Sequence, residues 1–333
     1  MQYGVAAEIE DDEDGTLERI LVLLDGTRDA DAVCAELPDL DPGGVREAIA
    51  ELAANGFLED AAAPLPISER EAARYASPRH YFAWIDDQPR ESPYEIQARL
   101  KKSSVAVLGL GGTGSAVAAG LVASGVGTVH CVDFDVVEEE NLCRQLLYTE
   151  SDVGLSKVKR AVERLREMNS LVRVTGEELR ATCADDIADL MAGRDVFVLC
   201  ADEPQPDISR WTNEAALRTG TPWFMALYTG PMAVVGHFRP GETGCWECLH
   251  RKASAQEHVA HGRRLFPGAP PNAVTAASAN VTGHMCALEV VYHLGGLRTQ
   301  VPGQAMHWNF AHWDHLYLKD VPDDPDCPSC GNG

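Results

Sequence analysis

Four of the ten cysteines stand in two pairs whose spacing suits a metal ion. Cys245 pairs with Cys248 and Cys327 pairs with Cys330, with two residues between the members of each pair. This spacing lets both thiolates of a pair point at one ion, and four thiolates complete a tetrahedral zinc site. Free thiols or a redox dithiol are the alternatives. Since such a site leaves no open position, the sequence predicts a structural zinc that ties the C-terminal tail to residue 245.

A glycine-rich loop is the second feature with chemical potential. Residues 109–114 read GLGGTG, follow the apolar run SVAVLGL and open a helical pattern. Glycines at such a turn let the backbone approach a phosphate, and the helix N-terminus favours negative charge. The loop alone fits NAD, FAD or ATP, and it is not a Walker A loop because no Gly-Lys-Ser/Thr follows. Its predicted contacts are the glycines Gly109, Gly111, Gly112 and Gly114.

Charged residues beyond this loop narrow the choice of nucleotide. Asp133 ends the next expected strand, TVHCVDFD, where an acid can accept hydrogen bonds from ribose hydroxyls. Asn141, Arg144 and Lys157 follow. Hydride transfer does not need two extra cations near the phosphates, whereas breaking a triphosphate does, because charge builds on its oxygens. Asp202, which ends VFVLCAD, is then predicted to hold magnesium, because hard cations take oxygen ligands.

The runs DFDVVEEENLCRQ and DVGLSK, with the glycine loop, resemble the ThiF/MoeB superfamily of ubiquitin-activating-type adenylyltransferases over roughly residues 75–330. The resemblance implies that a carboxylate attacks the α-phosphate of ATP, giving an acyl-adenylate and pyrophosphate. It implies that Asn141 and Arg144 bind phosphates and that Lys157 stabilises the α- and β-phosphates. It adds further candidate residues to the nucleotide site: Asp135, Gln145, Arg210 and Asn213.

The same resemblance implies a homodimer, in which an N-terminal arginine crosses the interface to the γ-phosphate. Arg79, in SPRHYF, is the candidate. The sequence departs from the family pattern after Asp202, because EPQPDISRWTN is longer than usual and lacks the family's asparagine. The expected crossover loop, near 254–275, contains His258 and His261 but no cysteine that could carry a thioester. The sequence therefore predicts adenylation without transthiolation.

Residues 16–60 predict a small N-terminal module. Three helical patterns, TLERILVLLDG, TRDADAVCAELP with a Thr27 cap, and DPGGVREAIAELAANGFLED, follow a possible strand and turn in YGVAAEIEDDEDG. This order predicts a winged-helix-like domain. The LLDGT turn and the terminal GFLED resemble the PqqD-like peptide-recognition domains, in which a precursor's leader peptide adds as a strand to a sheet edge. A helical appendage without a ligand is the alternative.

Charge is concentrated in this module. The chain carries 51 acidic and 28 basic residues, a net charge of −23, and residues 1–60 hold 17 of the acids and 3 of the bases, or −14. Such acidity excludes a nucleic-acid partner, which needs clustered Lys and Arg. It suits either solubility or the attraction of a basic ligand.

The remaining sequence signals concern location and the other cysteines. No apolar run is long enough for a membrane span, and the acidic N-terminus lacks the pattern of a signal peptide. We therefore expect a cytoplasmic protein without a disulfide framework. The other six cysteines are expected to be core thiols: Cys34, Cys131, Cys143, Cys183, Cys200 and Cys286.

From Ser103 onward, strand and helix patterns alternate, which predicts an α/β fold with a Rossmann-like doubly wound sheet of the ThiF type. Residues 307–315 are expected to form one strand with one buried face. The predicted domains are a PqqD-like leader-peptide recognition domain at 1–62, a linker and approach segment at 63–100, and an ATP-binding adenylation domain with the zinc site at 101–333.

Together these features predict an enzyme that resembles the microcin-type ThiF-like maturation enzymes. The expected reaction is the ATP- and magnesium-dependent adenylation of a carboxylate or amide on a ribosomally made precursor peptide, with release of pyrophosphate, in natural-product biosynthesis. The alternatives are a non-catalytic leader-binding partner of a YcaO cyclodehydratase, an activator of a ubiquitin-like sulfur carrier protein, and, last, an NAD dehydrogenase.

Overall fold

The computed structural model describes residues 9–86, 88–229, 231–257, 274–312, 314–317 and 324–331. The chain divides into two compact units, Met1–Arg99 and Leu100–Gly333. Most of the predicted N-terminal strand lies outside the described residues, as do His258 and His261 of the predicted crossover loop.

The first unit begins with three short helices: α1 (Thr16–Leu23), α2 (Ala30–Glu36) and α3 (Pro42–Ala54). The apolar faces of these helices meet in a small core around Ile20, Val33 and Val45. All three helical patterns are therefore present. Among residues 9–86 and 88–103 the structure contains no strand, so the winged-helix-like character remains a prediction.

The cap predicted for α2 is wrong. Asp29 caps this helix, because its carboxylate accepts a hydrogen bond from the Ala32 N–H at 2.8 Å. Thr27 instead lies in the preceding turn, where its N–H donates to the Asp25 carboxylate at 2.9 Å. The helix starts three residues beyond Thr27, so that side chain cannot reach the first free amides.

The segment predicted as a linker contains three helices: α4 (Glu69–Arg74), α5 (Ala76–Ala83) and α6 (Glu95–Lys102). Ser68 and Glu71 form a reciprocal capping box that starts α4. Tyr75 and Phe82 are buried, so these helices are packed and do not form an exposed linker. The capping box is readable in the sequence as Ser-x-x-Glu, a pattern that predicts the start of a helix within the segment predicted as a linker.

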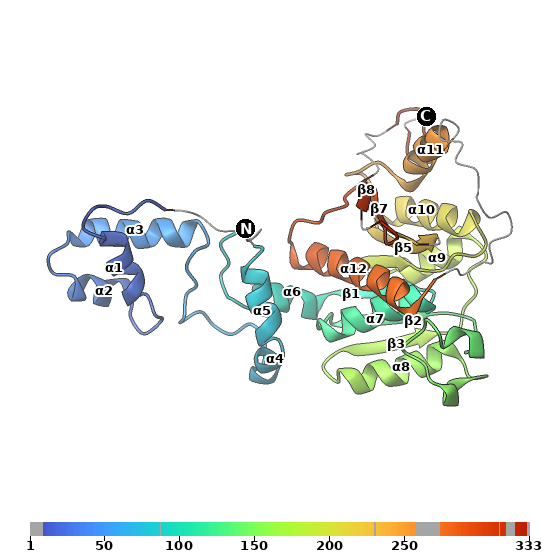
Figure 1. The fold of residues 1–333 in the computed structure, drawn as a ribbon, viewed down its shortest axis with the longest axis horizontal. Helices are drawn as coiled ribbons and strands as arrows, with labels where there is room; N and C mark the ends of the chain where they lie inside the picture. The colour runs from blue at the N-terminus through green and yellow to red at the C-terminus, as the bar shows by residue number, and fades with distance from the viewer. Residues whose placement is uncertain are drawn as a thin grey trace. The chain divides into compact units, whose positions relative to one another are not determined.

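The second unit is built on an eight-stranded sheet with the order β3-β2-β1-β4-β5-β6-β7-β8. Figure 1 shows this sheet among its helices. The strands are β1 (Ser104–Leu108), β2 (Thr128–Val132), β3 (Arg173–Glu177), β4 (Val196–Leu199), β5 (Trp223–Thr229), β6 (Met232–Phe238), β7 (Gln304–Asn309) and β8 (Asp314–Tyr317). From β3 to β5 the strands are parallel, and from β5 to β8 they are antiparallel. The Rossmann-like sheet is confirmed, with an antiparallel extension.

Residues 307–315 do not form one strand. β7 ends at Asn309, whose side-chain oxygen accepts a hydrogen bond from the Ala311 N–H, and the chain then turns back into β8. The two strands pair with Met306 opposite Tyr317. Polar and aromatic residues alternate through the turn in the same way as within the two strands. The sequence pattern therefore gave no sign that the chain reverses direction there.

Helices cover both faces of the parallel strands (Figure 1). One face carries α7 (Gly112–Ala123), α8 (Lys157–Met168) and α12 (Ala276–Gly295), and the other carries α9 (Ala184–Met191) and α10 (Asp207–Thr219). The helix α11 (Trp246–Glu257) follows β6. Two 3-10 turns, Glu139–Asn141 and Glu150–Asp152, lie between β2 and α8.

A close helix–helix contact fixes the start of α7. Small residues at intervals of four face one another along it, and we call this contact the α7–α12 seam: Gly112, Ala116 and Gly120 on α7, and Ala279, Gly283 and Ala287 on α12. A Cβ at Gly283 would lie 2.6 Å from that of Ala116, and a Cβ at Gly120 would lie 2.8 Å from that of Ala287. Only glycine at these positions permits the approach.

Within the part of the chain that the structure describes, no helix combines the length and the apolar composition that a membrane crossing requires.

Candidate functional site

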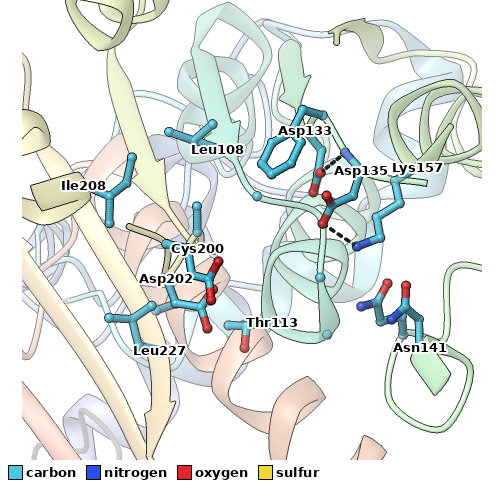
Figure 2. Close-up of a pocket in the computed structure, with 18 of the residues that line it drawn as sticks. Leu108, Thr113, Asp133, Asp135, Asn141, Lys157, Cys200, Asp202, Ile208 and Leu227 are labelled. Atoms are coloured by element: carbon cyan, nitrogen blue, oxygen red, sulfur yellow. Dashed lines mark hydrogen bonds and ion pairs between the residues drawn. The ribbon is translucent and has the colours of Figure 1, made fainter. Parts of the chain in front are cut away.

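A pocket of about 330 Å³ opens at the carboxyl ends of the parallel strands. Its walls come from the loops that follow β1, β2, β3 and β4, and from β5 (Figure 2). The strand order reverses between β1 and β4, and the crevice at such a switch point is where open α/β sheets bind their ligands. Ten of the predicted residues line the pocket: Gly109, Gly111, Gly112, Asp133, Asp135, Asn141, Arg144, Gln145, Lys157 and Asp202.

The glycine loop forms the floor of this pocket. Gly109 has a φ of +92°, and a Cβ there would come within 2.6 Å of the Ala201 backbone nitrogen. A Cβ at Gly114 would lie 1.8 Å from the Gly109 carbonyl oxygen. Gly114 therefore serves the close packing of the loop and is outside the pocket lining. The N-terminus of α7 is thereby held open toward the pocket, where its free amides favour an anion.

Asp133 connects the loop to β2. Its carboxylate accepts hydrogen bonds from the Leu110 N–H at 2.6 Å and from the Asp135 N–H at 2.8 Å. The Tyr148 hydroxyl donates to the Leu110 carbonyl at 3.0 Å, and burial raises the pKa of this phenol, which keeps it a donor. Both contacts fix the loop, and the Asp133 side chain keeps lone pairs that can accept ribose hydroxyls.

Two buried cations face the pocket. The Lys157 ammonium lies 3.1 Å from the Asp135 carboxylate, as Figure 2 shows, and its side chain is 7% exposed. The Arg144 guanidinium donates to the Glu140 carbonyl at 2.8 Å, and its side chain is 10% exposed. Lys157 is the first residue of α8, so the helix cap at Ser156 sets its position. Cations buried this deeply are suited to hold phosphates.

The polar residues between β2 and α8 complete this wall. Asn141 accepts a hydrogen bond from the Glu138 N–H at 3.1 Å, which closes the 3-10 turn that carries it. Gln145 is 2% exposed, and its side-chain oxygen has no hydrogen-bond partner among the described residues. Buried amide oxygens are rarely left unpaired, so Gln145 has capacity for a ligand.

Asp202 lies on the opposite side of the pocket, directly beyond β4. Tyr228, on β5, lies near both Asp202 and Arg144, and burial raises its pKa, an effect that the neighbouring arginine opposes. A carboxylate that faces two cations across a pocket is a suitable oxygen ligand for magnesium. The residues present therefore fit the predicted metal.

Besides Gly114, two predicted residues of the second unit, Arg210 and Asn213, are outside the pocket lining. Arg210 is exposed on α10 and pairs with Asp207 at 2.7 Å. Asn213 is buried, and its oxygen accepts a hydrogen bond from the Trp246 N–H at 2.9 Å. Arg79, in the first unit, forms an ion pair with Glu59 and lies over the Tyr94 ring at 5.6 Å, and its contact across a homodimer interface remains a prediction. Arg210 and Asn213 lie on different faces of α10, and the periodicity of the sequence did not predict which face is directed to the pocket.

Three residues that the sequence analysis passed over also line the pocket: Thr113, Phe134 and Arg180. The Arg180 guanidinium lies over the Phe134 ring, 4.6 Å from its centroid. Phe134 is 48% exposed. Its position between Asp133 and Asp135 was a signal, because an aromatic residue there has no core to fill. Arg180 carried no local signal, since it follows β3, which is far from the glycine loop in the sequence and lies at the edge of the sheet.

The prediction of six core thiols is partly wrong. Cys34, Cys131 and Cys286 are buried, but Cys143 and Cys183 are exposed. Cys200 is intermediate in exposure and lines the pocket. Cys143 lies in the turn that carries Arg144, and Cys183 precedes α9, so neither is on an inward-facing position of a helix or strand.

The four paired cysteines come together as a cluster, which we call the cysteine clasp. All four sulfurs lie within 4.8 Å of one another. Cys245 Sγ is 3.7 Å from the sulfurs of Cys248 and Cys327, and the Cys248 and Cys330 sulfurs are 3.4 Å apart. Four thiolates on a tetrahedral zinc would be about 3.8 Å apart for bonds of about 2.3 Å. The clasp can therefore hold a metal ion.

The chain is similar to proteins of known family. The sequence matches the ThiF family over residues 86–330. The sulfur carrier protein adenylyltransferase of Thermus thermophilus is 35% identical over 254 residues, covering 73% of this chain and 88% of that protein. The adenylyltransferase and sulfurtransferase MOCS3 of Mus musculus is 33% identical over 242 residues, covering 71% of this chain but 49% of that protein.

Among solved structures, E. coli MccB in complex with MccA-N7isoASN is similar with a TM-score of 0.76 and 25% sequence identity. The similarity covers 97% of this chain and 92% of that one. The family match spans most of the chain and includes every residue that lines the pocket and all four cysteines of the clasp. The chain belongs to the ThiF family, and it has the adenylyltransferase fold of that family.

Proposed function

We propose that this protein adenylates a carboxylate or amide on a ribosomally made precursor peptide, using ATP and magnesium and releasing pyrophosphate. The observation that carries the proposal is the convergence of Arg144, Lys157 and Asp202 on one pocket whose floor is a helix N-terminus. A nucleotide-binding protein that only held NAD would have no use for buried cations on one wall and a metal carboxylate on the other.

In the proposed reaction, an oxygen of the peptide attacks the α-phosphorus. A new oxygen–phosphorus bond forms, the bond to the β-phosphate oxygen breaks, and pyrophosphate leaves with the electron pair. Asp133 would hold the ribose, while Asn141, Arg144 and Lys157 would bind the phosphates and stabilise the charge that builds on their oxygens. Magnesium, held by Asp202, would neutralise the leaving pyrophosphate.

The first unit supports a peptide as the substrate. A groove of about 290 Å³ lies between α1 and α3, with an apolar floor that includes Leu17, Ile20 and Val45. Asp11, Asp12 and Asp41 stand around it. Their charge complements a basic segment. We propose that a leader peptide with apolar and basic residues occupies this groove.

Two likenesses bear on the substrate. E. coli MccB, solved with MccA peptides, is similar over 97% of this chain and so over both units. The Thermus relative activates a sulfur carrier protein, according to its name, and its similarity covers 73% of the chain. The broader coverage favours the peptide, and a sulfur carrier protein is the second candidate substrate. A homodimer and a YcaO partner remain proposals that follow from the sequence resemblance.

The test is to mix the protein with Mg-ATP and either a candidate precursor peptide or a sulfur carrier protein, and to measure AMP or pyrophosphate release with the mass of the acceptor. Arg144→Ala and Asp202→Ala should reduce turnover by at least about 10²-fold while leaving leader binding unchanged. Arg210→Ala is the matched control, since it removes an arginine outside the pocket and should leave both unchanged.

Each outcome has a distinct meaning. Peptide-dependent release with a shifted peptide mass supports the proposal. Carrier-dependent release would replace the peptide with the second candidate. Tight leader binding without AMP or a mass change would instead assign a docking role beside a separate enzyme, and equal loss of binding and turnover in the variants would contradict the division of labour between the two units.

A further inference from the structure

One buried hydroxyl in the pocket has no partner in the protein. Thr113 is 3% exposed, and its Oγ1 makes no hydrogen bond to any residue that the structure describes. Burying a hydroxyl without a partner costs free energy, roughly 1–3 kcal/mol in proteins. A position that keeps such a group is therefore a candidate for contact with a ligand.

Other buried helix hydroxyls in this chain show what Thr113 lacks. The Thr212 hydroxyl donates to the Ile208 carbonyl, and the Thr282 hydroxyl donates to the Ser278 carbonyl, both at 2.8 Å. Each uses the carbonyl four residues earlier in its own helix. Thr113 is the second residue of α7, so no preceding helical turn offers a carbonyl. The position in the helix explains why this hydroxyl is left unpaired.

Thr113 is also held in place. The α7–α12 seam packs against its backbone, because a Cβ at Gly283 would lie 2.4 Å from the Thr113 carbonyl oxygen. Thr113 lines the same pocket as Asp202 and Arg144, and Figure 2 labels it beside that pocket. The free amides of the first turn of α7 lie beside it.

We propose that the Thr113 hydroxyl donates a hydrogen bond to an oxygen of the α-phosphate, the group that receives the attack. This assignment rests on the proposed function. The Thr113 hydroxyl adds a neutral hydrogen-bond donor to the backbone amides and cations of the site. A phosphate at physiological pH presents only acceptors, so it can pair with this donor. The hydroxyl keeps its proton throughout the reaction and acts by stabilising the charge that grows on the phosphate oxygen.

The test separates this contact from a structural role. Thr113→Val removes the hydroxyl with little change of volume, and Thr113→Ser restores it. Ser115→Ala is the matched control: Ser115 is 2% exposed in the same turn, but its hydroxyl is satisfied by the Gly112 carbonyl at 3.3 Å. Affinities for AMP and for adenosine are measured by calorimetry, because only AMP carries the α-phosphate. Thermal unfolding of the nucleotide-free variants is recorded as well.

Thr113→Val should weaken AMP binding by about tenfold, as expected for a lost hydrogen bond to a charged group, and leave adenosine binding unchanged. Where turnover is measurable, kcat should fall by about 10²-fold with a smaller change in KM for ATP. The nucleotide-free variant should unfold at the same temperature as the parent or higher, since it no longer buries an unpaired hydroxyl. Thr113→Ser should recover AMP binding, and Ser115→Ala should not weaken it.

Equal losses for AMP and adenosine, unchanged AMP binding, or a lower unfolding temperature with matching loss of activity would each overturn the assignment. The binding measurement needs no peptide. It can therefore succeed even if the precursor peptide proves to be the wrong substrate, and it can fail while peptide adenylation is confirmed.

Discussion

At the scale of single residues, the pocket combines two kinds of contact. Asp133, Arg144 and Lys157 carry formal charges, and their own protein partners hold them in position. Thr113 and Gln145 instead present uncharged atoms without described partners. Charged groups provide attraction, whereas unpaired buried polar atoms discriminate, because a ligand that cannot pair with them leaves them unsatisfied. Selectivity in this site should therefore depend on its uncharged residues as well.

The stacked Phe134 and Arg180 side chains line the pocket, and we predict that the base of the nucleotide binds against them. Arg180→Ala should raise KM for ATP about three- to fivefold with a smaller effect on kcat, because a cation over an aromatic face contributes on the order of 1 kcal/mol. Steady-state kinetics with varied ATP would show this. Arg173→Ala, which removes an exposed arginine outside the pocket lining, is the control. An unchanged KM in Arg180→Ala would place the base elsewhere.

The sequence was informative wherever a residue's role is local. Asp133, Asn141, Arg144 and Lys157 belong to short runs, so their spacing predicted their convergence on the pocket. Asn213 and Arg180 could not be assigned in this way. Whether Asn213 faces the nucleotide or Trp246 depends on the rotation of α10, which tertiary packing sets. Arg180 reaches the pocket because β3 pairs with β2, and this pairing could not be predicted from the sequence.

At the scale of elements, the entry to α8 is held by one buried acid. The Asp152 carboxylate accepts hydrogen bonds from Arg160 and Arg164, both at 2.7 Å, and from the Thr149 N–H at 2.8 Å. Burial raises the pKa of Asp152, but these hydrogen bonds outweigh it and hold the pKa at about 2. Because Asp152 precedes α8 by a few residues, this network sets the position of Lys157 in the pocket.

Asp152→Asn should lower the free energy of unfolding at pH 7 by about 3 kcal/mol, since it leaves two arginines without their buried partner. The folded pKa lies below the ordinary value of 3.8, so the contribution of Asp152 is fully present above about pH 4 and is lost as the pH falls toward 2. Urea unfolding should thus show parent and variant converging between pH 4 and pH 2.

A surface pair gives the control for this measurement. Glu163 also pairs with Arg160 but is exposed, so Glu163→Gln should change stability by less than about 1 kcal/mol. A difference between parent and Asp152→Asn that persists unchanged at pH 2 would contradict the explanation by ionisation.

The elements themselves divide into those that the sequence could predict and those that it could not. β1 and β4 are short apolar runs between helical patterns, and the alternation of such strands with helices made a parallel sheet predictable. The β7–β8 hairpin was not, because His307 and Trp308 have polar atoms and the pattern continues through the turn. The α7–α12 seam was also hidden, since its matching four-residue intervals lie on helices far apart in the chain.

At the scale of the whole molecule, a metal at the cysteine clasp would contribute to the stability of the second unit. We predict one zinc per chain by elemental analysis. Cys330→Ser should lose the metal and lower the unfolding temperature by on the order of 10 °C, because binding free energy at a structural site adds to folding free energy. Cys183→Ser removes an exposed cysteine outside the clasp and should leave metal content unchanged. Full stability in metal-free parent protein would contradict this role.

Unequal distribution of charge also belongs to this scale. Residues 1–60 carry −14 of the −23 net charge, and the groove between α1 and α3 lies within them. The proposed nucleotide pocket, in contrast, presents buried cations. A basic peptide and a polyanionic nucleotide would thus be attracted to different parts of the chain, which lets both bind without competing for one surface.

The clasp has a consequence for the connectivity of the chain. Cys245 and Cys327 are 82 residues apart, so a shared metal would close the intervening polypeptide into a ring. Such closure narrows the conformations of the unfolded chain, as a disulfide does. A single proteolytic cut inside the ring would then produce two fragments that stay bound in one particle. They would separate only after denaturation, and a chelator would make that separation easier.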